Sequence, residues 1–455
     1  MSRPSRFSRL PGFRDFPPEE LALRSHIFET WRRVSRRYGF VEYDGPPLEE
    51  LGLYTEKSGD EIVTQLYNFT DKGGREVALR PEMTPSLARM LAERSRALPK
   101  PIRWYSIPQL FRYERQQRGR LREHFQWNVD LVGAEGMGAE AEVLAVALDS
   151  LAELGLGAGE VVARISDRRL LAAILGSAGV PQDRLLAAYA VIDKVEREEA
   201  ERSRDRLVEE AGLARDAAER ILDLFGTPGL EGVEAAFGED DQVAGSLAEI
   251  RAFLAAMEEL GFGDRVAFDL TIVRGLAYYT GVVFEVFDRA GEFRAICGGG
   301  RYDSLLERMG GESLSAVGFG MGDVVLSEIL REREMAPDTT RSVDFYIVAI
   351  GEEQAGLARR IAGVRRAAGN SVLYSLGGQS VRKQFSAAST EGARRTIVLG
   401  PDEVGRGVAT LRDMTSGTER EVGLDALLDL ESKLDLPPTG AAHAEGDPAE
   451  AGTRT

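Results

Sequence analysis

Arginine is concentrated in one short segment that lies between two strand-like runs. The stretch FRYERQQRGRLRE, residues 111–123, holds five arginines and two glutamates, a local net charge of +3 in a chain whose formal charge is −17. Guanidinium groups are planar forks of donors that suit phosphate oxygens, and a loop between strands can hold several of them over one surface. The segment indicates a polyphosphate site, although an exposed basic hairpin without a ligand fits these residues equally well.

A carboxylate and a hydroxyl stand two residues apart in RPEMTP, residues 80–85. On an extended strand, Glu82 and Thr84 would share a face and could both accept hydrogen bonds from an ammonium group. Thr84 before Pro85 also fits the N-cap of a helix with proline in the first turn. That second interpretation leaves Glu82 unexplained.

A third group combines Arg274 with Tyr278 and Tyr279, followed by the glycine run 298–300. An arginine beside paired tyrosines can hold an anion in an aromatic pocket, and a glycine triplet lets the backbone approach a ligand closely. The sequence contains neither GxGxxG nor GxxxxGK[ST], which disfavours an ordinary dinucleotide site and a P-loop.

No nucleophile with a neighbouring base stands out. The single cysteine, Cys297, adjoins the glycines in a strand-like run and is expected to be a buried structural thiol. His124 follows the arginine segment and is expected to be a satisfied or exposed residue, and no metal site built from protein side chains is predicted. The chemistry must therefore rest on charge and positioning.

The composition limits the class of protein. A chain of 455 residues predicts two to four domains, and one cysteine with three histidines excludes a small scaffold held by disulfides or zinc. The N-terminus lacks the apolar core of a signal peptide, and no apolar run reaches 18 residues. We therefore expect a soluble cytoplasmic protein without a membrane partner.

The elements that must position these residues follow from apolar spacing. Residues 20–38 predict a helix, and the runs around 71–74 and around the arginine segment predict two antiparallel hairpins. From 138 to 262 helical patterns dominate, including one run over 184–210, and strands return between 265 and 303. A helical module therefore interrupts a sheet, and beyond residue 342 strands and helices alternate, with one helix expected from Arg359 to Ala368.

Taken in order, these motifs resemble those of the histidyl-tRNA synthetases, a family of class II aminoacyl-tRNA synthetases. The similarity covers nearly the whole chain. FRYERQQRGRLREHFQ resembles the family's motif 2, VRGLAYYTGVVFE and CGGGRYDSL its two histidine motifs, and YGFVEYDGPPLEE its motif 1, in which Pro46 would lie at a dimer interface. Each motif alone is weak, but the set is specific.

The resemblance implies a fold of the α/β class with an α+β catalytic core, in which helices flank the antiparallel sheet of class II synthetases. The core would comprise residues 1–169 and 259–336, interrupted by a helical insertion at 170–258. An α/β anticodon-binding domain would follow at 342–436, and a disordered tail at 437–455.

The resemblance also implies a role for individual residues. Arg112 would hold the α-phosphate of ATP and Arg274 both the histidine carboxylate and the α-phosphate, as the catalytic residues. The polar and aromatic side chains around histidine would be Glu82, Thr84, Gln126, Asp130, Arg274, Tyr278 and Tyr279. ATP would contact Arg112, Glu114, Arg120 and Arg122, with Glu114 on the adenine amino group, and the tRNA acceptor end would contact Gln116, Gln117 and Arg118.

The implied activity is that of a histidine–tRNA ligase. It would activate L-histidine with ATP and Mg²⁺, with no organic cofactor, and transfer the histidyl group to tRNA(His) as a homodimer. An acidic chain at first argues against a nucleic-acid partner, but residues 341–436 carry 13 basic and 13 acidic side chains. The acidic excess lies elsewhere, so RNA binding would be confined to a few faces and weakened by salt.

Two departures from the family pattern keep alternatives open. Ala277 replaces an aspartate, and motif 3 reads GFGMGDVVL, with Val324 and Val325 where an acid and an arginine usually stand. Loss of activity would suit the regulatory subunit of ATP phosphoribosyltransferase, a silent paralogue that usually lacks the anticodon-binding domain. An RNA-binding protein built on an inactive core is a third interpretation. Intact Arg112, Glu114 and Arg274 favour the enzyme.

Overall fold

The chain forms two compact units, Met1–Pro337 and Asp338–Thr455. The computed structural model describes residues 7–55, 63–115, 117–195, 198–226, 229–273, 279–338 and 342–434. The tail expected at 437–455 lies outside the described residues. Within the described ranges, none of the helices is both long enough and apolar enough to cross a membrane.

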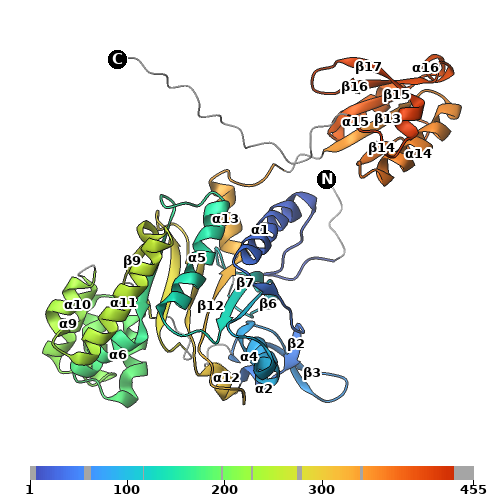
Figure 1. Ribbon diagram of the computed structural model, residues 1–455. Helices are drawn as coiled ribbons and strands as arrows, with labels where there is room; N and C mark the ends of the chain where they lie inside the picture. The colour runs from blue at the N-terminus through green and yellow to red at the C-terminus, as the bar shows by residue number, and fades with distance from the viewer. Residues whose placement is uncertain are drawn as a thin grey trace, which may run out of the picture. The chain divides into compact units, whose positions relative to one another are not determined.

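One large sheet organises the first unit (Figure 1). Its strands follow the order β1-β5-β7-β12-β11-β10-β8-β9, and β6 also pairs with β7. Neighbouring strands are antiparallel except at the two edges, where β1 pairs with β5 and β8 with β9 in parallel, so the predicted antiparallel core is confirmed. The bounds are β1 (Val41–Glu42), β5 (Ile102–Ser106), β6 (Gln109–Phe111), β7 (Glu123–Val132), β8 (Val161–Asp167), β9 (Val266–Phe268), β10 (Val282–Asp288), β11 (Cys297–Arg301) and β12 (Ala316–Gly322).

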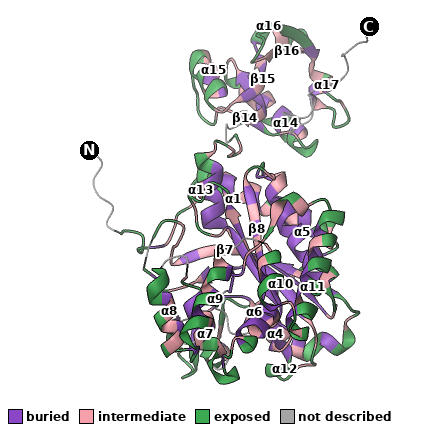
Figure 2. Ribbon diagram, turned by 90° about the vertical axis from the view of Figure 1, so that its left-hand side faces the viewer, coloured by how far each residue is buried: buried purple, intermediate pink, exposed green. Residues whose placement is uncertain are grey.

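Helices cover one face of this sheet and make the main hydrophobic core. They are α1 (Pro18–Arg37), α5 (Met137–Glu153) and α13 (Asp323–Glu332). The apolar spacing of α1 directs Trp31 inward, where its ring stacks on Trp127 of β7 with centroids 5.7 Å apart. Figure 2 shows the buried residues gathered along the strands and the inner faces of these helices.

A smaller sheet, in the order β2-β4-β3, lies beside helices that pack on the other face of the large sheet. It contains the hairpin predicted around residues 71–74. The bounds are β2 (Leu48–Glu50), β3 (Tyr67–Thr70), β4 (Glu76–Leu79), α2 (Gly52–Thr55), α4 (Thr84–Arg94), the short 3₁₀ helix η1 (Ser95–Ala97) and α12 (Leu305–Arg308).

Of the two local interpretations of Thr84, the extended strand is wrong, whereas the helix start with proline in its first turn is confirmed. Glu82 and Thr84 do not share a strand, because β4 ends at Leu79 and α4 begins at Thr84. The N-cap of α4 is Met83 rather than Thr84, and no side chain caps it. Pro85 in the first turn fixes a helical φ and lacks the N–H that the helix start would leave unpaired, so the helix starts without a side-chain cap.

The helical insertion between β8 and β9 is present. Aspartates cap its first and last α-helices: Asp167 accepts from the N–H groups of Arg169 and Leu170, and Asp240 from those of Gln242 and Val243. Its elements are α6 (Arg168–Ser177), η2 (Gln182–Arg184), α7 (Leu185–Ile192), α8 (Ala200–Glu209), α9 (Arg215–Phe225), α10 (Glu231–Phe237), α11 (Asp241–Glu259) and η3 (Gly263–Arg265).

The single helix expected over 184–210 is wrong, because the structure contains two helices there, α7 and α8. Between the buried Ile192 and the buried Ser203 the sequence reads DKVEREEAER, in which one valine and one alanine interrupt a run of charges. Such a stretch offers no continuous apolar stripe to bury, so the two helices pack separately.

The second unit is an α/β domain with its own core. Its sheet runs in the order β14-β13-β15-β16-β17, with parallel pairs around β13 and antiparallel pairs beyond β15. The helix expected to start at Arg359 instead begins at Glu352, and β17, α16 and α17 were not predicted. The bounds are β13 (Val343–Ala349), α14 (Glu352–Ala367), β14 (Val372–Tyr374), α15 (Val381–Thr390), β15 (Ala393–Leu399), α16 (Pro401–Gly405), β16 (Val408–Asp413), β17 (Glu419–Gly423) and α17 (Leu424–Leu428).

The glycine at the middle of β11 yields a stability prediction. A Cβ on Gly299 would lie 2.7 Å from both Phe284 Cζ and Phe319 Cβ, so Gly299→Ala should overpack the core and destabilise the first unit by ~1–3 kcal/mol. Gly245→Ala, on the exposed face of α11 with nothing within 4 Å, should instead stabilise it by roughly 0.5–1 kcal/mol. Calorimetric melting of the two variants tests this, and equal melting temperatures would contradict it.

Candidate active site

Two connected pockets lie on the face of the large sheet opposite α5. The larger pocket encloses about 880 Å³ and the smaller about 80 Å³. Both are lined by Arg112, Gln126, Gly298 and Gly320, so these residues form a junction between them. Two ligands held side by side would meet at this junction.

Glycines form the floor of both pockets. On β12, Gly318 pairs with Asp130 of β7 and Gly320 with Gly298 of β11. A Cβ on Gly320 would lie 2.8 Å from the side-chain Cδ of Gln126, and one on Gly318 would collide with the Asp130 carboxylate. Because these glycines have no side chains, they leave the space that the side chains of β7 occupy.

The smaller pocket brings together most of the residues predicted to bind histidine. Its wall contains Glu82 and Thr84 from the start of α4, Gln126 and Asp130 from β7, and Tyr279 before β10. Strand alternation explains the pair on β7, since residues four apart share one face. The two remaining members of the predicted set, Arg274 and Tyr278, lie outside the described residues, as does Ala277.

Asn128 and Tyr302 also line the smaller pocket and were missed from the sequence. Asn128 lies between Gln126 and Asp130 on the same strand face, so the alternation of β7 could have revealed it. Tyr302 directly follows β11, and its hydroxyl donates a hydrogen bond to Asp130 Oδ1. No local pattern pairs Tyr302 with a residue 172 positions away.

Asp130 is a strongly perturbed acid of the smaller pocket. It is 5% exposed, and burial raises its pKa to about 7, partly offset by the hydrogen bond from Tyr302. Near neutral pH the group exists in both protonation states. It can therefore accept a hydrogen bond from a ring N–H, or donate one to a ring nitrogen, with little change in free energy.

The larger pocket contains three of the four residues predicted to bind ATP. Arg112 and Glu114 lie just after β6, and Arg120 on the returning side of the arginine segment. Arg112 Nε donates to Pro81 O at 2.9 Å, and Arg120 forms an ion pair with the buried Glu114. The structure places Arg122 off the wall of this pocket: its guanidinium stacks 4.1 Å above the Tyr113 ring.

His124 also lines the larger pocket, a placement that the sequence did not predict. Burial, together with the positive charges of Arg112, Arg14 and Arg120, lowers its pKa to about 3. The imidazole is therefore neutral at physiological pH and retains one nitrogen that can accept a hydrogen bond. It is a polar group that adds no charge beside Arg112.

The turn of the arginine segment at residues 117–119, here called the arginine loop, lines a third hollow of about 280 Å³ that adjoins the larger pocket. Gln117 and Arg118 line it, whereas Gln116 lies outside the described residues. The Arg118 guanidinium lies 4.7 Å above the Phe293 ring and pairs with Glu332 of α13. These contacts tie the arginine loop to the opposite wall.

The two valines at the start of α13 line the larger pocket, and each is 8% exposed. The residue before them, Asp323, accepts from the backbone N–H of Phe125 at 2.9 Å and from the Arg14 guanidinium, which also binds Glu123. This buried cluster fixes the start of α13 against β7. Val324 and Val325, which follow Asp323, occupy the positions at which motif 3 was expected to have an acid and an arginine.

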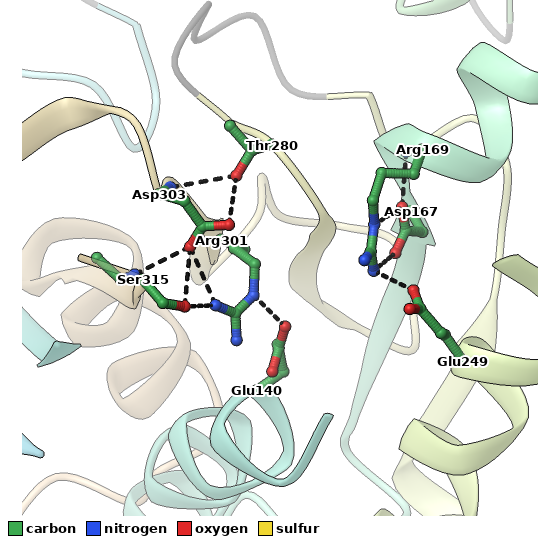
Figure 3. Close-up of polar contacts among 9 residues, drawn as sticks. Glu140, Asp167, Arg169, Glu249, Thr280, Arg301, Asp303 and Ser315 are labelled. Carbon is green, nitrogen blue, oxygen red and sulfur yellow. Dashed lines mark hydrogen bonds and ion pairs between the residues drawn. The ribbon is translucent and has the colours of Figure 1, made fainter. Parts of the chain in front are cut away.

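A buried polar network supports the glycine floor from its far end (Figure 3). Arg301, at the end of β11, donates to Glu140 of α5 and to Asp303 and Ser315. The Thr280 hydroxyl donates to the same Asp303 at 3.2 Å. The network thus joins the strand after the glycines to the segment that carries Tyr279.

Figure 3 also shows Arg169 bridging Asp167, at the end of β8, and Glu249 of α11. Since Asp167 is fully buried, its charge requires this partner and the N–H groups of α6 that it caps. The bridge connects the helical insertion to the edge of the sheet.

Comparisons with known proteins agree on one family. A family model described as histidyl-tRNA synthetase matches residues 12–323, and one described as an anticodon binding domain matches 344–433. The histidine–tRNA ligase of Opitutus terrae is 42% identical over 91% of this chain and 96% of its own length. The chloroplastic/mitochondrial histidine–tRNA ligase of Arabidopsis thaliana is 38% identical over 91% of this chain and 85% of its own. The crystal structure of histidyl-tRNA synthetase from Nostoc sp. PCC 7120 superposes with a TM-score of 0.78 at 25% identity, covering 94% of this chain and 99% of that one.

The raised pKa of Asp130 predicts that stability depends on pH. The folded state retains a proton that the unfolded state loses near pH 4, so Asp130 lowers the free energy of unfolding progressively from about pH 4 to pH 7. Asp130→Asn should remove this penalty and stabilise the first unit by ~2–4 kcal/mol at pH 8, with the gain vanishing toward pH 4. Urea unfolding at pH 8 and pH 4.5, with exposed Asp183→Asn as the control, measures it. A gain equal at both pH values would contradict the assignment.

Proposed function

The chain belongs to the histidyl-tRNA synthetase family, and on that premise we propose that it is a histidine–tRNA ligase whose two joined pockets hold histidine and ATP. The observation that carries the proposal is the junction at Arg112, which lines both pockets. The regulatory-subunit alternative is not favoured, because the relatives are ligases and an anticodon-binding domain is present.

In this proposal the smaller pocket binds histidine. Glu82 and Thr84 accept hydrogen bonds from the ammonium group, and Gln126 and Asp130 bind the imidazole ring. Polar groups that pair both ring nitrogens reject apolar amino acids, because binding such a substrate would leave buried polar atoms unpaired. Tyr279 closes the pocket.

Activation occurs at the junction. A carboxylate oxygen of histidine attacks the α-phosphorus of ATP, the new C–O–P linkage forms, and pyrophosphate leaves. Negative charge grows on the equatorial oxygens of the pentavalent phosphorus, so a positioned cation stabilises the transition state more than the ground state. We assign this role to Arg112 and, from the sequence pattern, to Arg274, whereas Tyr278 would help Tyr279 to close the histidine pocket.

The larger pocket binds ATP. Glu114 would receive the adenine amino group, and its buried carboxylate forms an ion pair with Arg120. Mg²⁺ accompanying ATP fits this pocket because Glu285 supplies a carboxylate on its wall, the ligand type that Mg²⁺ prefers. When bound, the ion would neutralise charge on the β- and γ-phosphates.

The second step transfers the histidyl group from the adenylate to the terminal ribose hydroxyl of tRNA(His). We propose that Gln116, Gln117 and Arg118 of the arginine segment contact the acceptor end, and that the domain at 342–436 reads the anticodon. Because few faces are basic, binding should be steeply weakened by salt.

The remaining boundaries and the location stay predictions. We propose that residues 1–169 and 259–336 form the catalytic core, interrupted by the insertion at 170–258, and that 437–455 is a tail. A cytoplasmic location is predicted from the single cysteine, which favours a reducing compartment.

We also propose that the chain is a homodimer through the motif 1 segment around Pro46. The strand β1 stands at one end of the large sheet, and Val41 on it is 62% exposed. Leu48 nearby is 37% exposed. An exposed edge strand bearing apolar side chains favours pairing with a second copy.

The dimer proposal makes a prediction about mass in solution. The wild-type chain should sediment at twice the mass of one chain, and Val41→Asp should shift it to the monomer. Leu186→Asp, another exposed apolar position at 66%, is the matched control and should stay dimeric. A monomeric wild-type chain, or a dimer insensitive to Val41→Asp, would contradict the proposal.

The ligase proposal predicts histidine-dependent exchange of pyrophosphate into ATP by the purified protein. Arg112→Ala should lower the exchange rate by a factor on the order of 10²–10³, because it removes charge stabilisation at the reacting phosphorus. Arg274→Ala should do the same, whereas Arg96→Ala, 86% exposed on η1, should leave the rate unchanged.

Absence of exchange above background, with tRNA and Mg²⁺ present, would refute the ligase proposal. Histidine binding without ATP turnover would instead fit the regulatory subunit. Urea unfolding of each variant shows whether a lost rate reflects a lost fold.

A further inference from the structure

The wall of the larger pocket at the start of α13 is apolar where the family's motif 3 has an arginine. A Cβ built on Gly119 in the arginine loop would lie 3.0 Å from Val325 Cγ2. Gly119 also has a φ of +72°, a conformation that favours glycine. The methyl groups of Val325 therefore pack directly under the loop and carry no charge to this end of the pocket.

An arginine from a different element reaches the same place. Arg294 lies in the connection between β10 and β11, and its Cδ is 3.9 Å from the same point above Gly119. Its side chain lines the larger pocket and the adjoining hollow. The stem of Arg294 thus stands beside Val325, at a point that Glu328 Oε2 also approaches to 4.0 Å.

The guanidinium of Arg294 is available for an anion. It donates to the neutral Gln117 Oε1 at 2.9 Å and forms no ion pair within the described part of the chain. The neighbouring arginines are engaged with carboxylates: Arg120 with Glu114, and Arg118 with Glu332. An exposed cation paired only with an amide loses little when it binds phosphate.

Two arginines of the larger pocket that form no ion pair among the described residues border different ends of it. Arg112 borders the junction with the smaller pocket, whereas Arg294 borders the hollow under the arginine loop. If Arg112 holds the α-phosphate, as the proposed function requires, the pocket continues toward Arg294. We propose that Arg294 binds the terminal phosphates of ATP in place of the missing motif 3 arginine.

The assignment differs from the sequence expectation in one respect. The sequence assigned Arg120 and Arg122 to ATP beside Arg112, but the structure pairs Arg120 with Glu114 and places Arg122 over Tyr113. The sequence offered no reason to select Arg294, because the connection between β10 and β11 contains no recognised motif.

The test compares two ligands that differ in the terminal phosphates. ATP carries them, whereas a non-hydrolysable histidyl-adenylate analogue does not. Arg294→Ala should weaken ATP binding by roughly 10- to 100-fold, as expected for loss of a charged hydrogen bond, and should leave binding of the analogue within about twofold. Arg294→Glu should weaken ATP binding further, through repulsion, and Arg96→Ala should change neither.

Unchanged ATP affinity in Arg294→Ala, or an equal loss for ATP and the analogue, would overturn the proposal. Equal affinity of Arg294→Ala and Arg294→Glu for ATP would also overturn it, since charge would then be irrelevant. Because binding is measured directly by calorimetry, a protein that binds ATP without pyrophosphate exchange would refute the ligase function while still reporting on Arg294.

Discussion

The pockets of this protein depend on one packing constraint: two neighbouring strands carry glycine on the face where other strands carry side chains. On β11 and β12 the open face is backbone at Gly298, Gly318 and Gly320, and a methyl group at either β12 position would meet a side chain of β7. Glycine weakens a strand through its conformational freedom. The opposite face offsets this, because Phe319 and Met321 alternate with the glycines and pack into the main core.

Because the floor carries no side chains, buried polar side chains can surround a ligand there. Their burial shifts the pKa of an acid such as Asp130 and lowers the stability of the empty site. Asp130 is held in a nearly water-free position, where burial raises its pKa, and Glu82 beside it is 5% exposed. Such groups lower the stability of the empty protein, and a ligand that pairs them recovers that free energy as affinity. The Arg301–Glu140 pair at the end of the floor anchors β11 to α5 and so fixes the strand that carries the glycines.

Motif 3 lacks its expected arginine, and a positive charge in the pocket can come from another part of the chain. The start of α13 keeps a structural role through Asp323, which Arg14 and the backbone of Phe125 bind, while the valines that follow only pack. A phosphate responds to where a guanidinium lies and not to the element that carries it. In the proposed arrangement an adjacent connection supplies the cation, and the pocket keeps its function with a different set of elements.

The sequence by itself determined the antiparallel core, the helical insertion, the α/β domain and most of the polar residues of the smaller pocket, because periodicity and short motifs act over a few neighbouring residues. It left open whether Thr84 lies on a strand or at the start of a helix, and it did not determine that charges would divide the expected helix into α7 and α8 or that α14 would begin at Glu352. Only the tertiary structure decided that Tyr302 meets Asp130, that His124 turns into the larger pocket, and that Arg294 stands beside Val325. These pairs join strands and loops far apart in the chain, and contacts of that kind arise from how sheet register and loop packing place side chains, which no local pattern encodes.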